Sequence, residues 1–233
     1  MKSIKTIYHG SSDIIKRPEH GKGNKNNDYG LGFYCTEDLE LAKEWACSDE
    51  SGGFANIYAI DTSKLSIFDL SQSQCGSMDW LALLVNNRIF SITSPMAAEA
   101  KEYITEHFLP DLSSADAVVG YRADDSYFAF AMDFLSNTIS MRQLNRAMRF
   151  GNLGEQFVLK SRKAFDLIQF ERGETANGKI YYHKRKKRDS DAREEYLKRE
   201  RKITRSGGDI FMLDILREEI KSGDERLQRN LFE

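Results

Sequence analysis

The sequence predicts a single α+β domain spanning residues 1–233. Short apolar segments with strand-like alternation lie within the first 70 residues and again near residue 155, and such alternation is typical of half-buried strands. The stretch between them, about 71–149, is dominated by helical apolar spacing. With 233 residues, 40% of them hydrophobic, the chain can bury a sizeable core.

In the N-terminal part, strands are expected over residues 4–9, 32–35, 54–61 and 65–70, with a polar loop over residues 21–30. A helix is expected to begin at Thr36, whose hydroxyl would cap it. Acidic residues occupy the first turn after Thr36, and apolar residues then follow at helical spacing. These apolar residues are Leu39, Ala42, Trp45 and Ala46.

The middle of the chain predicts mainly helices, at residues 80–85, 97–108, 126–135 and 140–148. Ser140 is a plausible cap for the last of them. Strands are expected over 116–120 and 155–160, and a short helix over 162–167. Residues 209–221 form an amphipathic pattern, which predicts that the C-terminal part docks on the domain.

Positive charge is concentrated in one stretch, although the net charge is only −2. Residues 171–206 contain 13 Lys or Arg and 7 Asp or Glu, centred on the run from Lys184 to Arg188. One interpretation is a patch for nucleic acid or another polyanion, since clustered cations release counterions when they bind phosphates. The other is a solvated, charged helical segment over about 184–205, because both signs alternate after Asp191.

The sequence favours a soluble cytoplasmic protein. The first residues show no signal-peptide pattern, and no stretch approaches the roughly 20 apolar residues of a membrane span. Cys35, Cys47 and Cys75 lack the close spacing of zinc ligands or a redox dithiol. We expect reduced thiols, no metal site and no membrane partner.

Two motifs near the N-terminus carry the strongest functional signal. Tyr8-His9-Gly10-Ser11 is followed by the loop 28–36, whose residues Gly32, Phe33 and Tyr34 open the second expected strand. Glycine permits close approach to the backbone, and tyrosine offers a flat apolar face with a polar tip. His9 and Tyr34 are therefore expected to face one cleft that holds a planar, charged small molecule.

These motifs, followed by the segment 155–158, resemble the three-motif scheme of the diphtheria-toxin and poly(ADP-ribose)-polymerase branch of ADP-ribosyltransferases. The chain is similar, more closely, to a family of uncharacterised bacterial proteins of that superfamily, often encoded in operons suggestive of toxin systems. This closer resemblance also includes residues 56–61, 116–120, 123–125 and 214–219. It implies a split, strongly bent antiparallel sheet around a nucleotide cleft, with a mostly helical insertion at about 71–149.

The resemblance implies that NAD is the substrate and that no metal takes part. In that superfamily the histidine binds the ribose next to nicotinamide, the following glycine contacts the carboxamide, and the tyrosine stacks on the nicotinamide ring. These roles would fall to His9, Gly10 and Tyr34. Ser11, Gly32 and Phe33 complete the expected NAD-binding set.

The third motif departs from the commonest pattern, because Gln156 stands where the polymerase branch usually has a catalytic glutamate. Glutamine can hydrogen-bond a ribose hydroxyl but brings no negative charge. Glu155 cannot replace it, since adjacent strand residues point to opposite faces. One expectation is that Asp124 or Asp125, in the loop after the strand 116–120, supplies the missing carboxylate. The alternative is that the acceptor itself provides much of the driving force, so that a single ADP-ribose is transferred without a glutamate. Chain elongation to a polymer is not expected.

Three functions follow from these patterns. The first is a mono-ADP-ribosyltransferase that modifies a protein or nucleic acid, as the toxic half of a bacterial pair with an antitoxin partner. The second is a module that binds NAD or ADP-ribose without transfer. The third is a nucleic-acid-binding protein that uses Lys184 to Arg188.

Overall fold

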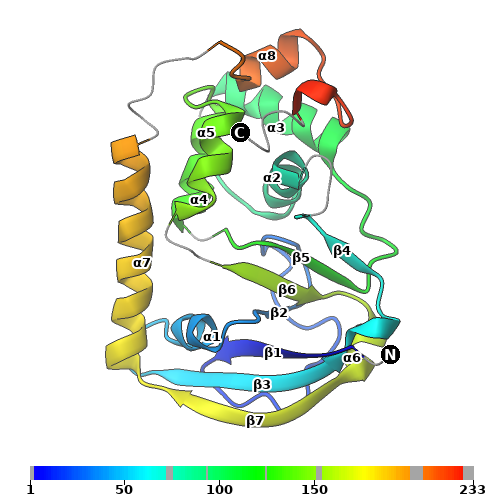
Figure 1. Cartoon of the computed structure of the whole chain (residues 1–233), viewed down its shortest axis with the longest axis vertical. Helices are drawn as coiled ribbons and strands as arrows, with labels where there is room; N and C mark the ends of the chain where they lie inside the picture. Colours follow the sequence, from blue (N-terminus) through cyan, green and yellow to red (C-terminus); the bar gives the residue numbers. More distant parts are fainter. Residues whose placement is uncertain are drawn as a thin grey trace.

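A computed structural model describes residues 3–71, 76–92, 94–123, 125–150, 154–199 and 207–227. Its strands form two sheets, and helices pack around them, so the predicted α+β class is confirmed. Figure 1 shows three layers from bottom to top: one sheet, the other sheet, and a group of helices.

The first sheet contains three antiparallel strands in the order β1-β3-β7. They are β1 (Ile4–Ser11), β3 (Gly53–Asp61) and β7 (Ile168–Ala176). The sequence predicted β1 and β3 but assigned no strand to β7. Alternation in β7 is weak because much of it is half-buried or exposed at the edge of the sheet, where one face meets solvent.

The second sheet contains four strands in the order β2-β6-β5-β4. They are β2 (Phe33–Cys35), β6 (Glu155–Leu159), β5 (Ala117–Tyr121) and β4 (Ile67–Asp69). The expectation of a wholly antiparallel sheet is wrong for one pair, because β4 and β5 run parallel. Parallel neighbours require a long crossover, and the chain between these two strands is long enough to hold two helices.

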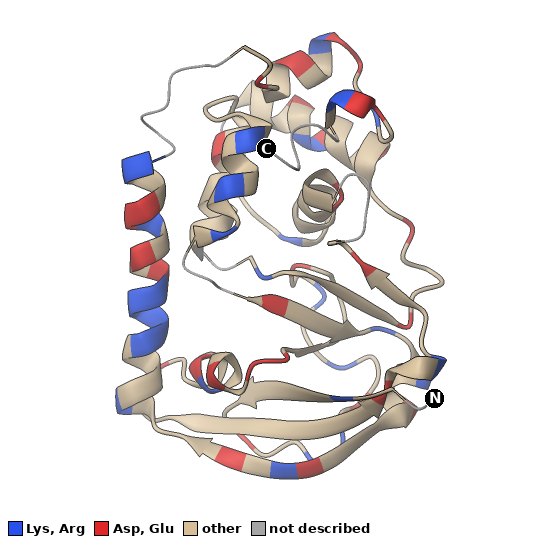
Figure 2. Cartoon of the chain, in the orientation of Figure 1, with Lys and Arg blue, Asp and Glu red and all other residues tan. Residues whose placement is uncertain are grey.

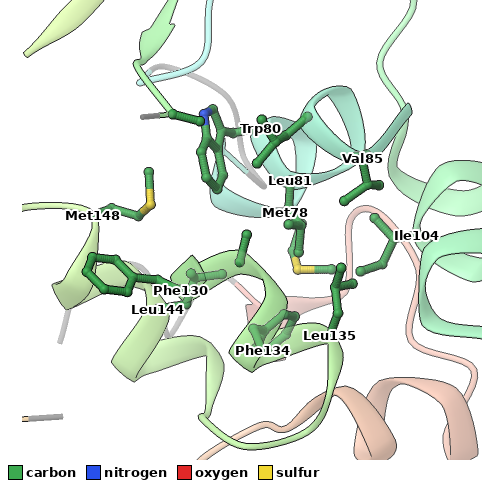
Figure 3. Packing of buried hydrophobic residues seen from close by; sticks show 14 of the residues in the cluster. Met78, Trp80, Leu81, Val85, Ile104, Phe130, Phe134, Leu135, Leu144 and Met148 are labelled. Atoms are coloured by element: carbon green, nitrogen blue, oxygen red, sulfur yellow. The ribbon is translucent and has the colours of Figure 1, made fainter. Parts of the chain in front are cut away.

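The largest core lies in the upper helical layer and against the second sheet. Its helices are α2 (Gly76–Asn87), α3 (Pro95–Phe108), α4 (Asp125–Leu135), α5 (Met141–Ala147) and α8 (Met212–Arg217). Figure 3 shows Trp80 and Leu81 of α2 facing Phe130 and Phe134 of α4 across this core. Ser140 caps α5 as predicted, through a reciprocal capping box with Gln143.

Helix α1 (Leu39–Ala46) begins later than predicted, and Thr36 is not its cap. Asp38 is the N-cap: its carboxylate accepts hydrogen bonds from the amides of Glu40 and Leu41 at 2.8 and 3.2 Å. Thr36 instead forms a backbone bridge to Tyr8. Three acidic residues at this helix start made the capping pattern ambiguous in the sequence, and the pairing of Thr36 with β1 decided it.

The basic stretch belongs to the long helix α7 (Gly178–Arg199), which is preceded by the short helix α6 (Arg162–Leu167) and β7. Residues 200–205 of the predicted helical segment lie outside the described residues. Figure 1 shows α7 standing beside α1 and reaching up to the helical layer, and Figure 2 shows positive charges gathered on its lower half. A 3₁₀ turn, η1 (Thr62–Lys64), completes the described elements.

Candidate functional site

Two backbone hydrogen bonds join the sheets where the candidate site lies. The Tyr8 amide donates to the Thr36 carbonyl oxygen at 2.8 Å, and the Thr36 amide donates to the Tyr8 carbonyl oxygen at 2.9 Å. His9 directly follows Tyr8, and Tyr34 lies two residues before Thr36. The bridge therefore brings together two site residues that are 25 positions apart in the sequence.

His9 is held by the backbone of Tyr34. Its Nδ1 lies 2.7 Å from the Tyr34 carbonyl oxygen, and because a carbonyl can only accept, Nδ1 carries the proton. Burial lowers the pKa of His9 below its ordinary value, although this hydrogen bond opposes the shift. The ring is therefore neutral at pH 7, which leaves Nε2 as a hydrogen-bond acceptor.

Tyr34 is fixed through its hydroxyl group, which accepts from the Tyr29 amide at 3.0 Å and donates to the Gly30 carbonyl oxygen at 2.6 Å. Burial raises the pKa of Tyr34, so the hydroxyl stays protonated. With both hydroxyl functions used by the loop, the ring is the part of Tyr34 that remains for contact with a ligand.

Gln156 is buried on β6, with 6% of its surface exposed. Its Oε1 is buried and has no hydrogen-bond partner among the described residues. Buried amide oxygens nearly always have a partner. A carboxamide without one is therefore the kind of group that a ligand hydroxyl or amide satisfies. Its neighbour Glu155, the first residue of β6, is exposed, whereas the four residues that follow it in the strand are buried.

His9, Tyr34 and Gln156 line one cavity of about 870 Å³, within the roughly 300–1,000 Å³ usual for small-molecule and cofactor sites. Three strands supply these side chains: β1, β2 and β6. Gly10 also lines the cavity.

The remaining residues of the expected NAD-binding set make packing contacts or hydrogen bonds within the protein. Phe33 stacks on the His9 ring, with 4.3 Å between ring centroids. Ser11 donates to the Asp13 carbonyl oxygen and accepts from Asn56. A Cβ on Gly32 would lie 2.7 Å from a methyl carbon of Val158, so this glycine lets the loop pack on β6. None of the three lines the described cavity.

The sequence offers two candidate carboxylates shortly after β5. Asp124 and the side chain of Asp125 lie outside the described residues. Two other carboxylates do line the cavity. Asp28 accepts from Arg88 at 2.7 Å and from the Ala123 amide at 2.9 Å, and Asp189 forms an ion pair with Arg193 at 3.0 Å.

Burial raises the pKa of Asp28, with Arg88 opposing the shift. Asp28 was not predicted as a site residue, because its partner Arg88 lies 60 positions away in the chain.

Two further parts of the lining were also missed. Trp45 was expected on the apolar face of its helix, but it is only half-buried and lines the cavity, with the Arg122 guanidinium 4.6 Å above its ring. Residues of α7 contribute another wall: Tyr182, Arg185, Lys186, Asp189 and Ser190. These residues recur every three to four positions in the sequence, and this spacing indicates that they share one face of a helix.

The described parts of the chain contain neither a candidate metal site nor a candidate membrane-spanning helix. No group of three or more His, Cys, Asp or Glu side chains there is arranged to hold a metal ion. No helix in those parts has the length and apolar character needed to cross a bilayer. Cys35 and Cys47 are buried free thiols, and Cys75 lies outside the described residues.

No curated protein and no solved structure matches the chain. A family model does match it over residues 5–170, a range that includes His9, Tyr34 and Gln156 and ends before α7. Since this range covers more than half of the chain, the protein belongs to the family described as proteins of unknown function, DUF3990.

Proposed function

We propose that this protein is a mono-ADP-ribosyltransferase that cleaves NAD and transfers ADP-ribose to a protein or nucleic-acid acceptor. The observation that carries the proposal is the convergence of His9, Tyr34 and Gln156, from three separate strands, on one cavity of about 870 Å³. Each of the three offers a function suited to the nicotinamide riboside half of NAD.

The Tyr34 ring is suited to stacking on the planar nicotinamide, since its hydroxyl is already fixed by the loop. Nε2 of the neutral His9 ring is suited to accepting a hydrogen bond from a ribose hydroxyl. The buried Gln156 carboxamide is suited to a second ribose hydroxyl. Together these contacts would hold the glycosidic bond in one orientation, which lowers the entropic cost of reaction.

In the proposed reaction the bond between ribose C1′ and the nicotinamide nitrogen breaks. The bonding electrons leave with nicotinamide, which departs as a neutral molecule. A nucleophilic atom of the acceptor forms the new bond to C1′ and loses its proton to solvent or to a nearby base. Positive charge develops on the ribose ring in between, and the site must tolerate it.

Gln156 contributes no negative charge to that transition state, and the two described carboxylates of the cavity are each paired with an arginine. The acceptor must therefore supply much of the driving force. This favours a single transfer to a reactive acceptor over slow hydrolysis by water or elongation of a polymer.

The same observation favours a second candidate function, a module that binds NAD or ADP-ribose without breaking the glycosidic bond. Such a module needs the cavity and the hydrogen-bonding groups but no charge stabilisation. The two functions differ in one product, free nicotinamide.

The test is to incubate the purified protein with NAD labelled in its adenylate part and a whole-cell lysate. Transfer predicts that label enters macromolecules and nicotinamide is released. Loss of bound label after protease or nuclease treatment then identifies the acceptor class. If NAD binds but no label is transferred and no nicotinamide appears, the transferase proposal fails and the binding module stands.

A further inference from the structure

Helix α7 presents two adjacent faces with different partners. One face carries Tyr181, Lys184 and Arg188, which contact the acidic residues of α1. The other carries residues 182, 185, 186, 189 and 190, which line the cavity. Both sets recur every three to four positions, which is the spacing of one helical face. The run of basic residues is thus divided between packing and the cavity.

The ion pairs follow the same division. Lys184 pairs with Glu40 at 3.0 Å, Lys187 with Asp191 at 2.6 Å, and Arg188 with Glu44 at 2.8 Å. No such pair joins Arg185 or Lys186 to a carboxylate anywhere in the described chain. Of the five residues in the run, the two that line the cavity are the two without a carboxylate partner among the described residues.

The contacts that these two cations make with the rest of the described chain leave most of their donors unused. The Arg185 guanidinium has one long hydrogen bond, 3.5 Å, to the Cys47 carbonyl oxygen. The Lys186 ammonium lies 4.5 Å from the centre of the Tyr182 ring. Arginine has five N–H donors and lysine three, so both retain donors for an anionic ligand.

The wall that carries them is held at both ends. Below, Arg188 makes two hydrogen bonds to the buried Glu44 of α1. Above, the Tyr196 hydroxyl donates to Asp133 of α4 at 2.5 Å, and its ring lies 4.1 Å from that of Phe130. A wall fixed in this way can present charged groups to a ligand with little loss of entropy on binding.

The rest of the cavity adds to its positive character. Arg88 and Arg122 also line it. With Arg185 and Lys186 they make four cations against two described carboxylates, Asp28 and Asp189. A cavity with this excess of positive charge is suited to phosphate groups, which arginine binds through two parallel hydrogen bonds and lysine as a point charge.

We propose that Arg185 and Lys186 form the pyrophosphate-binding part of the cavity, so that α7 acts as a wall of the dinucleotide site. This inference rests on the proposed function and extends it, because the nicotinamide end alone would not use these cations. It also accounts for the basic stretch without a nucleic-acid partner.

The experiment measures binding by calorimetry to the full chain and to the double variant Arg185→Gln/Lys186→Gln. The ligands are NAD, ADP-ribose and nicotinamide riboside, which lacks phosphate. Lys187→Gln is the matched control, since it removes a neighbouring charge that lies outside the cavity. Thermal unfolding checks that each variant is folded.

The double variant is expected to bind NAD and ADP-ribose at least about tenfold more weakly, since hydrogen bonds to charged groups contribute about that factor each. Affinity for nicotinamide riboside should not change, and Lys187→Gln should bind all three ligands like the parent chain. Equal affinity of the parent and double variant for NAD and ADP-ribose would overturn the inference.

The inference and the proposed function fail in different ways. If the parent chain binds ADP-ribose through Arg185 and Lys186 but neither binds NAD nor releases nicotinamide, the pyrophosphate site stands and the transferase proposal falls. If NAD is turned over equally by the parent and the double variant, the transferase proposal stands and the pyrophosphate site falls. If single-stranded RNA binds and Lys187→Gln weakens it as much as the double variant does, the stretch is an exposed polyanion site, and the inference is wrong.

Discussion

His9 Nδ1 donates a hydrogen bond of 2.7 Å to the carbonyl oxygen of Tyr34, and this contact links β1 of one sheet to β2 of the other. The His9 ring also stacks on Phe33. Both contacts fix the ring orientation before any ligand arrives. The donor at Nδ1 in turn fixes the tautomer, so Nε2 is the acceptor.

Burial of His9 predicts a pH-dependent stability. In the unfolded chain His9 takes up a proton as the pH falls through about 6.5, whereas burial lowers the pKa of the folded ring. Its contribution to stability is thus complete above pH 6.5 and is lost as the pH falls towards the folded-state pKa. Urea unfolding at pH 7.5 and 5.5 should show a larger loss for the parent chain than for His9→Gln. Equal losses would mean that His9 titrates normally when folded.

Gly10 is expected to be required for packing as well as for the cavity. A Cβ at this position would lie 2.1 Å from the Ala42 carbonyl oxygen and 2.6 Å from the Ala46 amide nitrogen of α1. Gly10→Ala should therefore lower the free energy of unfolding by about 1–3 kcal/mol or more. Gly207→Ala is the control, because no atom of the described residues lies within 4 Å of its Cβ position. Chemical denaturation that finds the two variants equally stable would contradict this packing.

Arg188 is expected to anchor α7. It forms hydrogen bonds of 2.8 and 2.9 Å to Glu44, whose side chain is only 3% exposed. Arg188→Ala should lower stability by about 3 kcal/mol, because it leaves a buried carboxylate without its counter-charge.

Lys187→Ala breaks only an exposed pair with Asp191 and should cost at most about 1 kcal/mol. The paired variant Glu44→Leu/Arg188→Leu should recover much of the loss, since it removes both charges. Similar unfolding free energies for Arg188→Ala and Lys187→Ala would show that the helix is held by other contacts.

Gln156→Glu tests whether the lack of a negative charge at position 156 limits cleavage of NAD. A carboxylate at this position would stabilise the positive charge developing on the ribose, so nicotinamide release should rise by about tenfold or more. Gln156→Leu keeps a similar size but removes the hydrogen bond, and its turnover should fall. Rates measured by nicotinamide release that respond to neither substitution would place Gln156 outside the reacting site.

Much of the fold was predictable because most strands and helices carry clear local periodicity. β7 was not, since Glu171, Arg172 and Glu174 interrupt its apolar alternation at the sheet edge. The parallel pairing of β4 and β5 was missed because a strand's own sequence does not reveal its partner's direction. The start of α1 depended on the bridge between Thr36 and Tyr8, which joins distant segments.

The part of the candidate site that could be predicted is the part identified from the order of three motifs in the sequence. His9, Tyr34 and Gln156 were selected from the sequence, and the structure places all three in one cavity. Arg185 and Lys186 were not separated from their basic neighbours, because that separation depends on Glu40 and Glu44, more than 140 positions earlier in the chain.

Direct binding of NAD tests the central claim most sharply. Calorimetric titration of NAD into the parent chain, His9→Ala and Tyr34→Ala, each checked for folding by thermal unfolding, should show binding to the parent. Both variants should bind at least about tenfold more weakly, since each loses about 1.4 kcal/mol or more of ligand contact. If the parent chain does not bind NAD, or if both folded variants bind it with the parent's affinity, the cavity lined by His9 and Tyr34 is not an NAD site.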